Sequence, residues 1–502
     1  MNKNSATILF EIEENESLGR YLMAARDINQ GDVVINEAPV VKGPSQITGP
    51  VCLTCLQKIT KSSSVECKRC GWPLCKNDAC HETGTDHEAE CNWTMEKRRQ
   101  KVKISQFITP HRTYECVSVI RCLYLKENNP RVYKKLIELE SHCEQRKGSE
   151  KYESDKMIVA KFLNQFFKIS EDEFSQEEIL RICGIIQING HEVPLTDPPY
   201  VAIYEFTSML EHSCVPNCSK TFLNDGSLLI RATRPIKRGE HISICYTDPL
   251  WSTINRKEHL MLTKFFNCEC QRCADPTELG THYSALKCLK KTCDGYMTPH
   301  ITLNNNSLPD PQWKCASCAE LQDKEKVNSV LIRVAHDYSM TDKKDTESCK
   351  MFLDHYTKYK IIHENHYFLF DVRLKLAQLY GQTTENDIQS VSDEDLRHKI
   401  SLCEQILNFA KILFPAEWRI QGVLNFELHA SVAESARRQM LSGEIDSETL
   451  RNKLLKSKRW LEDSIFYLRY EPDILPEGKM AKQAKKNLID LESLLLKICL
   501  QL

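Results

Sequence analysis

The stretch that decides the fold is the loop EHSCVPNC at residues 211–218, followed by HISICY at 241–246 and CECQRC at 268–273. The second segment alternates polar and apolar residues after a KRGE turn, which predicts a β-strand that ends at Tyr246. The third segment supplies three cysteines, and three thiolates do not complete a tetrahedral zinc site. We therefore expect Cys214 as the fourth ligand. Together, the three segments predict an enzyme active site framed by a metal ion.

The order of these motifs resembles the SET domain of protein lysine methyltransferases, in which an NHSCxPN segment precedes a catalytic tyrosine and a CxCxxC segment. The resemblance implies Tyr246 as the catalytic residue and S-adenosylmethionine as the methyl donor. It implies one zinc site with ligands Cys214, Cys268, Cys270 and Cys273. The donor-binding positions that it implies are Gly19, Arg20, Tyr21, Asn189, Ser208, Glu211, His212, Tyr246 and Phe266.

Eight ligand-type residues form close pairs between residues 52 and 91, and eight ligands fill two tetrahedral zinc sites. Their spacing resembles a MYND finger, in which the first and third pairs share one ion and the second and fourth pairs share the other. The resemblance implies one site with Cys52, Cys55, Cys75 and Cys80, and a second with Cys67, Cys70, His87 and Cys91. The Cys75–Cys80 spacing is one residue longer than usual, so His81 is an alternative ligand.

With the finger included, the whole chain resembles the SMYD family, in which a MYND finger is inserted into a split SET domain. Three positions depart from the family pattern. Tyr21 stands where a second glycine is expected, Glu211 replaces an asparagine near the donor's carboxylate, and Lys264 replaces a second active-site tyrosine. These departures resemble the divergent SmydA members of arthropods, and each is expected to weaken catalysis or donor binding.

A further cysteine group follows the SET segment. It has C-x4-C and C-x2-C pairs and consists of Cys288, Cys293, Cys315 and Cys318. The spacing predicts a zinc ribbon, and the alternative is that these cysteines pack as small hydrophobic residues. With the ribbon, the chain has sixteen ligands and four zinc ions.

The two remaining long segments are predicted to be helical. Residues 93–182 carry apolar faces at helical spacing, and an SQEE capping box at residues 175–178 predicts a helix start. Beyond about residue 323, long amphipathic patterns end at Gly381, Pro415 and Pro472. Sequential helices with short polar connections predict stacked antiparallel hairpins of tetratricopeptide (TPR) type.

We therefore predict an α+β fold, with a SET-type β-rich core, an inserted MYND finger, a zinc-clamped post-SET segment and a C-terminal all-α TPR-like lobe. The predicted domains are the N-terminal part of SET (1–48), the MYND finger (49–92), a helical insert (93–182), the SET core (183–250), the post-SET segment (251–278), the zinc ribbon (279–322) and the helical domain (323–502).

Composition favours metal over disulfides and excludes several functional classes. The chain has 502 residues, 24 cysteines and a formal net charge of −2, so it lacks the basic character of a nucleic-acid binder. It has no apolar run of membrane-spanning length, and its polar start lacks a signal-peptide core. We expect a location in the cytoplasm and nucleus, where thiols stay reduced and clustered cysteines bind metal.

The function that we expect is a protein-lysine N-methyltransferase acting on histone or non-histone lysines, with a role in transcriptional repression. The alternative is a zinc-rich SET and MYND adaptor or co-repressor with weak or lost catalysis. A sequence-specific nucleic-acid binder is disfavoured, because no basic helix follows the zinc ligands. The expected partners are a protein substrate with a target lysine and proline-rich peptides bound by the MYND finger, and the chain is expected to be a monomer without a membrane anchor.

Elemental analysis of the purified chain is expected to give four zinc ions per chain. Structural zinc sites typically contribute about 10–16 kcal/mol of apparent binding free energy, so a strong chelator should unfold the N-terminal two-thirds before the C-terminal helices. Two or fewer zinc ions, or simultaneous loss of both parts, would contradict the assignment.

Overall fold

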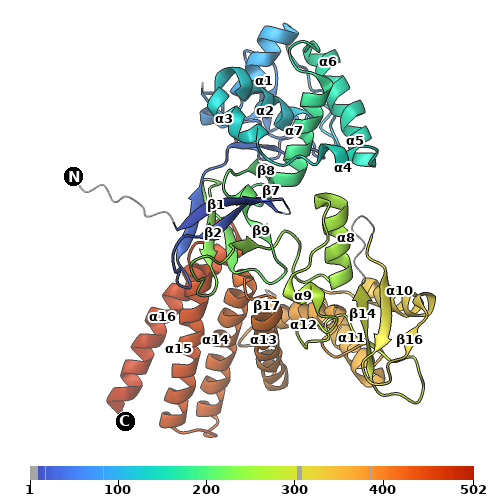
Figure 1. Ribbon diagram of the computed structural model, residues 1–502. Coiled ribbons are helices and arrows are strands. Elements are labelled where there is room, and N and C mark those ends of the chain that lie inside the picture. The colour runs from blue at the N-terminus through green and yellow to red at the C-terminus, as the bar shows by residue number, and fades with distance from the viewer. Residues whose placement is uncertain (1–8, 17, 83, 302–307, 384–385, 502) are drawn as a thin grey trace.

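The computed structural model describes residues 9–501 apart from 17, 83, 302–307 and 384–385, so the polar start of the chain lies outside it. The strands of the SET-type core lie between a helical insert and a helical C-terminal region (Figure 1). The predicted α+β class is confirmed. Among the described helices, none has the length and apolar character needed to cross a membrane.

Strands from two distant parts of the sequence build the SET core. Their bounds are β1 Phe10–Asn15, β2 Gly19–Ala24, β3 Val33–Glu37, β4 Val41–Pro44, β7 Gly190–Val193, β8 Tyr200–Ile203, β9 Glu211–His212, β10 Cys218–Phe222, β11 Leu228–Ala232 and β12 Ser243–Ile244. β1 and β2 form an antiparallel hairpin, whereas β3 joins β11 and β4 joins β8. The domain is therefore split, because strands before the finger pair with strands after the helical insert.

The finger and the insert follow β4. Their bounds are β5 Ser64–Glu66, β6 Pro73–Cys75, η1 Asp78–His81, α1 Glu88–Trp93, η2 Thr94–Arg98, α2 Val117–Asn128, α3 Pro130–Ile137, α4 Cys143–Arg146, α5 Glu150–Ser154, η3 Asp155–Ala160, α6 Lys161–Phe167 and α7 Gln176–Asn189. The predicted helix start is confirmed, because Ser175 Oγ accepts a hydrogen bond from the Glu178 N–H at 3.1 Å and so caps α7. The Glu178 carboxylate, which a full capping box would use, binds Lys126 and the Tyr133 hydroxyl. Finger, insert and SET strands share one hydrophobic cluster, which includes Trp72, Ile120 and Ile244.

The post-SET segment, the ribbon and the helical region complete the chain. Their bounds are α8 Thr253–Lys264, α9 Gln271–Ala274, β13 Leu286–Lys287, β14 Tyr296–Ile301, β15 Pro311–Cys315, β16 Leu321–Gln322, α10 Lys324–Met340, α11 Thr346–Tyr359, α12 Tyr367–Leu379, β17 Gln382–Thr383, β18 Asn386–Asp387, α13 Asp393–Leu413, α14 Trp418–Leu441, α15 Ser447–Leu468 and α16 Pro476–Gln501. The short helix η4 Thr207–Met209 belongs to the SET core, between β8 and β9. Strands β13 to β16 form one antiparallel sheet in sequence order.

The ribbon packs on the C-terminal helices and does not have a core of its own. Tyr283 precedes the ribbon, is fully buried, and lies with its ring centroid 5.8 Å from Phe370 of α12 and 5.6 Å from Phe414. Leu286 and Trp313 of the ribbon belong to the same hydrophobic cluster. The predicted boundary at residue 323 therefore runs through a shared core, so the ribbon is expected to unfold together with the C-terminal helices, in contrast to the order of unfolding expected from the sequence.

A buried arginine joins the SET core to the last helices. Arg231 of β11 is fully buried, and its guanidinium lies 4.5 Å from the ring centroid of Trp418 and 4.8 Å from that of Tyr470. Beside it, Thr221 Oγ1 of β10 donates to the Glu471 carboxylate at 3.1 Å. Cations stack favourably on aromatic faces, so these contacts fix the helical region against the sheet.

Replacing Phe370 with alanine is expected to destabilise the unit formed by ribbon and helices by about 3–5 kcal/mol, the usual cost of removing a buried aromatic ring. The shared core predicts that the ribbon cysteines become accessible in the same unfolding transition. Denaturant unfolding followed by a thiol reagent measures both effects. Ile332→Ala on α10, whose side chain is 69% exposed, is the control and should change stability by no more than about 0.5 kcal/mol. Separate transitions for ribbon and helices would contradict the shared core.

Candidate active site

All sixteen predicted metal ligands fall into four groups of four. Within each group, the sulfur or nitrogen donor atoms lie within 4.8 Å of one another. The groups are Cys52, Cys55, Cys75 and Cys80; Cys67, Cys70, His87 and Cys91; Cys214, Cys268, Cys270 and Cys273; and Cys288, Cys293, Cys315 and Cys318. The first two groups interleave along the chain as predicted for the finger. His81 lies outside the groups, with its Nε2 2.7 Å from the carbonyl oxygen of Cys75.

The spacing of the thiols fits tetrahedral zinc. A Zn–S bond of ~2.3 Å places the sulfurs of a tetrahedral site roughly 3.8 Å apart. The Sγ atoms of Cys55 and Cys75 are 3.8 Å apart, and those of Cys293 and Cys315 are 3.7 Å apart. Disulfide sulfurs would lie at about 2.05 Å. The cysteines are all free thiols, so the donor sets suit a metal ion.

A buried ion pair orients the histidine ligand of the finger. His87 Nε2 lies 3.2 Å from Cys70 Sγ, and its Nδ1 lies 3.1 Å from the Glu90 carboxylate. Arg121 of α2 binds the same carboxylate at 2.8 Å. Burial alone would raise the pKa of Glu90, but the charge of Arg121 and the bond to His87 lower that pKa to about 2. An ionised carboxylate behind a histidine ligand fixes the ring for metal binding.

The loop after β9 is tied to the tyrosine segment. β9 pairs with β12 in parallel, and Asn217 bridges them, because its Nδ2 donates to the His241 carbonyl at 2.7 Å and its Oδ1 accepts from the Ser243 N–H at 2.9 Å. The strand predicted over 241–246 is therefore shorter than expected. The Asn217 side chain takes backbone groups that a longer ladder would have used, and only Ser243–Ile244 remains as β12.

Tyr246 is held by the histidine of the loop. The Tyr246 N–H donates to His212 Nδ1 at 3.0 Å, and the Tyr246 hydroxyl donates to the Leu210 carbonyl. Burial lowers the pKa of His212 to about 4, so its ring is neutral at pH 7. Because Nδ1 accepts a hydrogen bond, the ring proton resides on Nε2, which faces Cys214 Sγ at 3.3 Å. Burial also raises the pKa of Tyr246, so its hydroxyl stays protonated.

Lys264 lies beside this tyrosine. Its Nζ donates to the Ile188 carbonyl at 2.6 Å and lies 5.9 Å from the centroid of the Tyr246 ring. Burial lowers the pKa of Lys264 to about 8. The lysine that replaces a family tyrosine therefore places an amine within the candidate site.

The other two residues that depart from the family pattern, Tyr21 and Glu211, both contact His241. The ring of Tyr21 stacks on His241 with centroids 4.6 Å apart, and His241 Nδ1 binds the Glu211 carboxylate. The Glu211 charge that sequence comparison suggested would face the donor thus has a partner from the chain itself.

The remaining residues that are predicted to bind the methyl donor are Phe266, Gly19, Arg20, Asn189 and Ser208. Phe266 lies 5.9 Å from the His212 ring, between centroids, and packs against the Cys214 cluster. Gly19 has φ +66°, and a Cβ added there would meet no atom within 4 Å. Three positions already use polar atoms within the protein: Arg20 donates to the Glu138 carbonyl, Asn189 to the Glu140 and Ile185 carbonyls, and Ser208 to the Tyr204 carbonyl.

A buried polar network behind the Cys214 cluster was missed by sequence reasoning. Arg256 of α8 is fully buried, and its Nε lies 3.2 Å from Cys214 Sγ. Glu278 binds both Arg256 and Arg272, at 3.4 and 2.9 Å. The one sequence signal was that Arg256 lies four residues before Leu260, on the buried face of the same helix.

Comparison with known proteins agrees with the predicted SET-type core. Residues 19–247 match the family model of the SET domain. SET domain-containing protein SmydA-8 of Drosophila melanogaster is 26% identical in isoform A, over 61% of this chain and 64% of that protein, and 28% identical in isoform B, over 62% and 66%. The chain thus spans just under two thirds of the length of these relatives.

Two further relatives are named as methyltransferases. Histone-lysine N-methyltransferase ASHR1 of Arabidopsis thaliana is 22% identical over 81% of this chain and 83% of that protein. Histone-lysine N-methyltransferase SMYD3 of Homo sapiens is 45% identical over 14% of this chain and 17% of that protein. The match to a solved structure of Rubisco LSMT bound to AdoMet covers 97% of this chain and 89% of that chain, at 10% identity and a TM-score of 0.25. The predicted resemblance to SET and MYND proteins of the SmydA type is confirmed.

Replacing Glu90 with alanine is expected to leave Arg121 buried without its partner and to cost about 3–5 kcal/mol of stability. The same change frees the His87 ring, so zinc affinity at that site should fall by about 10–100-fold. Competition with a coloured chelator should then show one zinc ion released before the other three. Glu88→Ala, two residues away and exposed, should leave zinc release unchanged. Equal release from both variants would contradict the role of Glu90.

Proposed function

We propose that this chain, which carries a SET domain and the paired zinc-ligand groups of a MYND finger, is an S-adenosylmethionine-dependent protein-lysine methyltransferase stabilised by four zinc ions. The observation that carries the proposal is the placement of Tyr246. Its ring centroid lies 5.2 Å from that of the neutral His212 and 5.9 Å from Nζ of the cationic Lys264, and the ring packs against the Cys214 cluster.

The residues around Tyr246 suit the proposed donor, which supplies an electrophilic methyl group on a sulfonium. Phe266 and the neutral His212 offer aromatic surface, and the backbone at Gly19 leaves open space where a side chain would stand. The polar atoms of Arg20, Asn189 and Ser208 that are bonded within the protein would serve the donor indirectly, by fixing the backbone around it.

Tyr246 acts by orientation. Methyl transfer to an amine is an in-line displacement, so the main tasks of the protein are to align the reactants and to exclude water. The hydroxyl of Tyr246 is anchored on the Leu210 carbonyl, while its backbone is anchored on His212. A general-base role is disfavoured, because burial raises the pKa of this hydroxyl above its ordinary value.

Lys264 supports deprotonation of the incoming lysine. A lysine with an ordinary pKa near 10.4 must lose a proton before it reacts, which costs about 4–5 kcal/mol at pH 7. The pKa of Lys264 is about 8, so this residue is still mostly cationic at pH 7. A neighbouring positive charge lowers the pKa of a second amine, so Lys264 favours the neutral form of the substrate.

The wider assignment rests on sequence resemblance. We propose histone or non-histone lysines as targets, a role in transcriptional repression, proline-rich partners at the MYND finger, and a monomeric chain in the cytoplasm and nucleus. The second candidate, a zinc-rich adaptor with weak or lost catalysis, is favoured by one observation. Lys264 bonds to the Ile188 carbonyl in the space beside Tyr246, where it competes with a substrate lysine.

Donor binding separates the two candidates. A calorimetric titration of the zinc-loaded chain with S-adenosylmethionine is expected to show one site, and a radiolabelled methyl-transfer assay on mixed protein substrates is expected to show turnover. Absence of donor binding would end the methyltransferase proposal and leave the adaptor. Donor binding without turnover would support a site that has lost catalysis.

Tyr246→Phe is expected to leave donor affinity nearly unchanged and to reduce turnover about 100-fold, the typical loss for removing one positioned hydrogen-bonding group. The physical reason is that the hydroxyl acts on the transition state and not on donor binding. The same two assays provide the measurement. Tyr296→Phe removes a hydroxyl from the ribbon strand β14 and should retain full turnover. Equal turnover in the two variants would remove Tyr246 from the mechanism.

A further inference from the structure

A cavity of about 420 Å³ lies next to the Cys214 cluster, on a side that Tyr246 does not line. Its walls come from α8, from the segment around α9 and from strand β14 of the ribbon. The apolar part of its lining includes Pro276, Pro299 and Ile301. The cavity therefore forms where the post-SET segment meets the ribbon.

Lys257 lines this cavity with a side chain that is almost wholly buried and whose ammonium has no partner among the described residues. The residue is only 2% exposed, yet its ammonium makes no hydrogen bond, ion pair or aromatic contact with any residue that the structure describes. Its neighbour Arg256 is different, because it binds Cys214 Sγ, Thr253 and Glu278. Buried charges are normally paired, so the ammonium of Lys257 is available to an anion that enters the cavity.

The rim of the cavity limits the charge of that anion. The Asp275 carboxylate is occupied by the Thr277 and Leu279 backbone N–H groups, at 2.8 Å each, but it remains negative. Glu269 is exposed and has no described partner. Two carboxylates beside one ammonium disfavour a phosphate dianion or a nucleic-acid backbone. A single carboxylate on an otherwise neutral or basic molecule matches this charge pattern.

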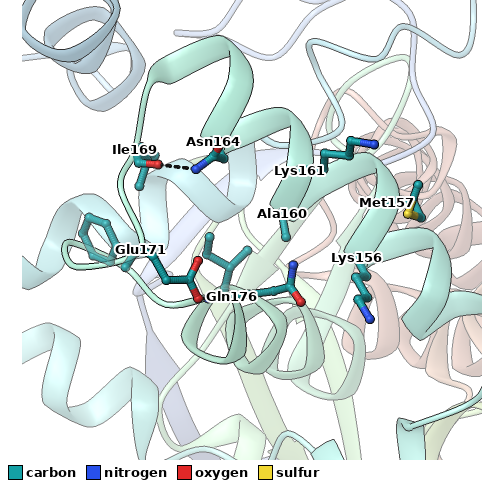
Figure 2. A pocket seen from close by; sticks show the side chains of 10 residues that line it. Lys156, Met157, Ala160, Lys161, Asn164, Ile169, Glu171 and Gln176 are labelled. Carbon is teal, nitrogen blue, oxygen red and sulfur yellow. Dashed lines mark hydrogen bonds between the residues drawn. The ribbon is translucent and has the colours of Figure 1, made fainter.

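A second cavity, of about 220 Å³, lies in the helical insert (Figure 2) and is not lined by a buried lysine. There, Asn164 Nδ2 is bonded to the Ile169 carbonyl at 2.9 Å, and Glu171 accepts the Gln176 N–H at 2.8 Å. Its two lysines, Lys156 and Lys161, are not buried. Of these two cavities, only the one at α8 is lined by a buried lysine that has no partner among the described residues.

We propose that the cavity at α8 binds a peptide through one Asp or Glu side chain, with Lys257 as the ion-pair partner and the two prolines as apolar walls. The carboxylate of the peptide would enter the cavity, and the backbone N–H groups or a basic neighbour would face Glu269. Cys273 lines the cavity and belongs to the cluster that packs against Tyr246. The peptide is therefore anchored one cysteine cluster away from the candidate active site, and its binding does not require methyl transfer.

A random heptapeptide display library, panned on the zinc-loaded full-length chain, is the probe. Peptides with one fixed acidic position are expected to be enriched, and the strongest is then labelled for fluorescence polarisation. Lys257→Met should weaken its binding about tenfold or more, because a hydrogen-bonded charge pair is worth at least one factor of ten. Changing the acidic residue of the peptide to its amide should weaken binding to the parent chain equally and add nothing in Lys257→Met.

Lys291→Met, which removes an exposed ribbon lysine outside the cavity, is the matched control and should bind as the parent chain does. The unfolding midpoint of Lys257→Met should be unchanged or higher, since no described contact is lost. The proposal is overturned if no acidic position is enriched, if Lys257→Met binds the peptide as well as the parent chain, or if inorganic phosphate displaces the peptide by binding at Lys257. A lower midpoint with loss of zinc would assign Lys257 a structural role instead.

Discussion

The cluster of Cys214, Cys268, Cys270 and Cys273 is the constraint on which the active-site geometry depends. Cys214 lies in the loop after β9. More than fifty residues later, Cys268 and Cys270 precede α9 and Cys273 lies within it, and the Sγ atoms of Cys214 and Cys273 are 3.5 Å apart. A zinc ion bound by four thiolates carries excess negative charge, which the buried Arg256 offsets from behind. Tyr246 and Phe266 pack against this cluster, so the four cysteines hold the tyrosine of the candidate site and its aromatic neighbour together.

Two hydrophobic clusters organise most of the rest of the chain. One unites the split SET strands with the finger and the insert, and the other unites the ribbon with α10 to α14. The predicted segments are therefore not expected to fold independently. A zinc-binding segment of some forty residues buries too little apolar surface to form a stable core by itself. Arg231 of β11, whose guanidinium stacks on Trp418 and Tyr470, joins the SET strands to the last helices outside these two clusters.

The structure changes the interpretation of the three residues that depart from the family pattern, Tyr21, Glu211 and Lys264. Tyr21 and Glu211 look like obstacles to the donor in a linear comparison, but both contact His241, which satisfies the carboxylate and the ring at once. Lys264 looks like the loss of a hydroxyl, yet it brings a buried amine, whose pKa is lowered to about 8, to within 5.9 Å of the Tyr246 ring centroid. Each effect depends on a partner distant in sequence.

The sequence by itself determined the chemistry that depends on local spacing. Cysteine pairs, the N-cap before α7 and the helical patterns all act within a few residues, so their residue types and intervals predicted the metal ligands and the helices, while the resemblance to SET and MYND proteins implied how the finger ligands are grouped. The tertiary structure alone decided the contacts between remote side chains. These include the bridge that Asn217 makes to the tyrosine segment, the ion pair of Glu90 with Arg121, and the core shared by ribbon and helices. The tertiary structure also decided that Lys257 is buried without a partner among the described residues. The reason is that the burial and pairing of a charged side chain depend on which surfaces of the fold meet. The spacing of residues along the chain does not encode how close two remote side chains lie.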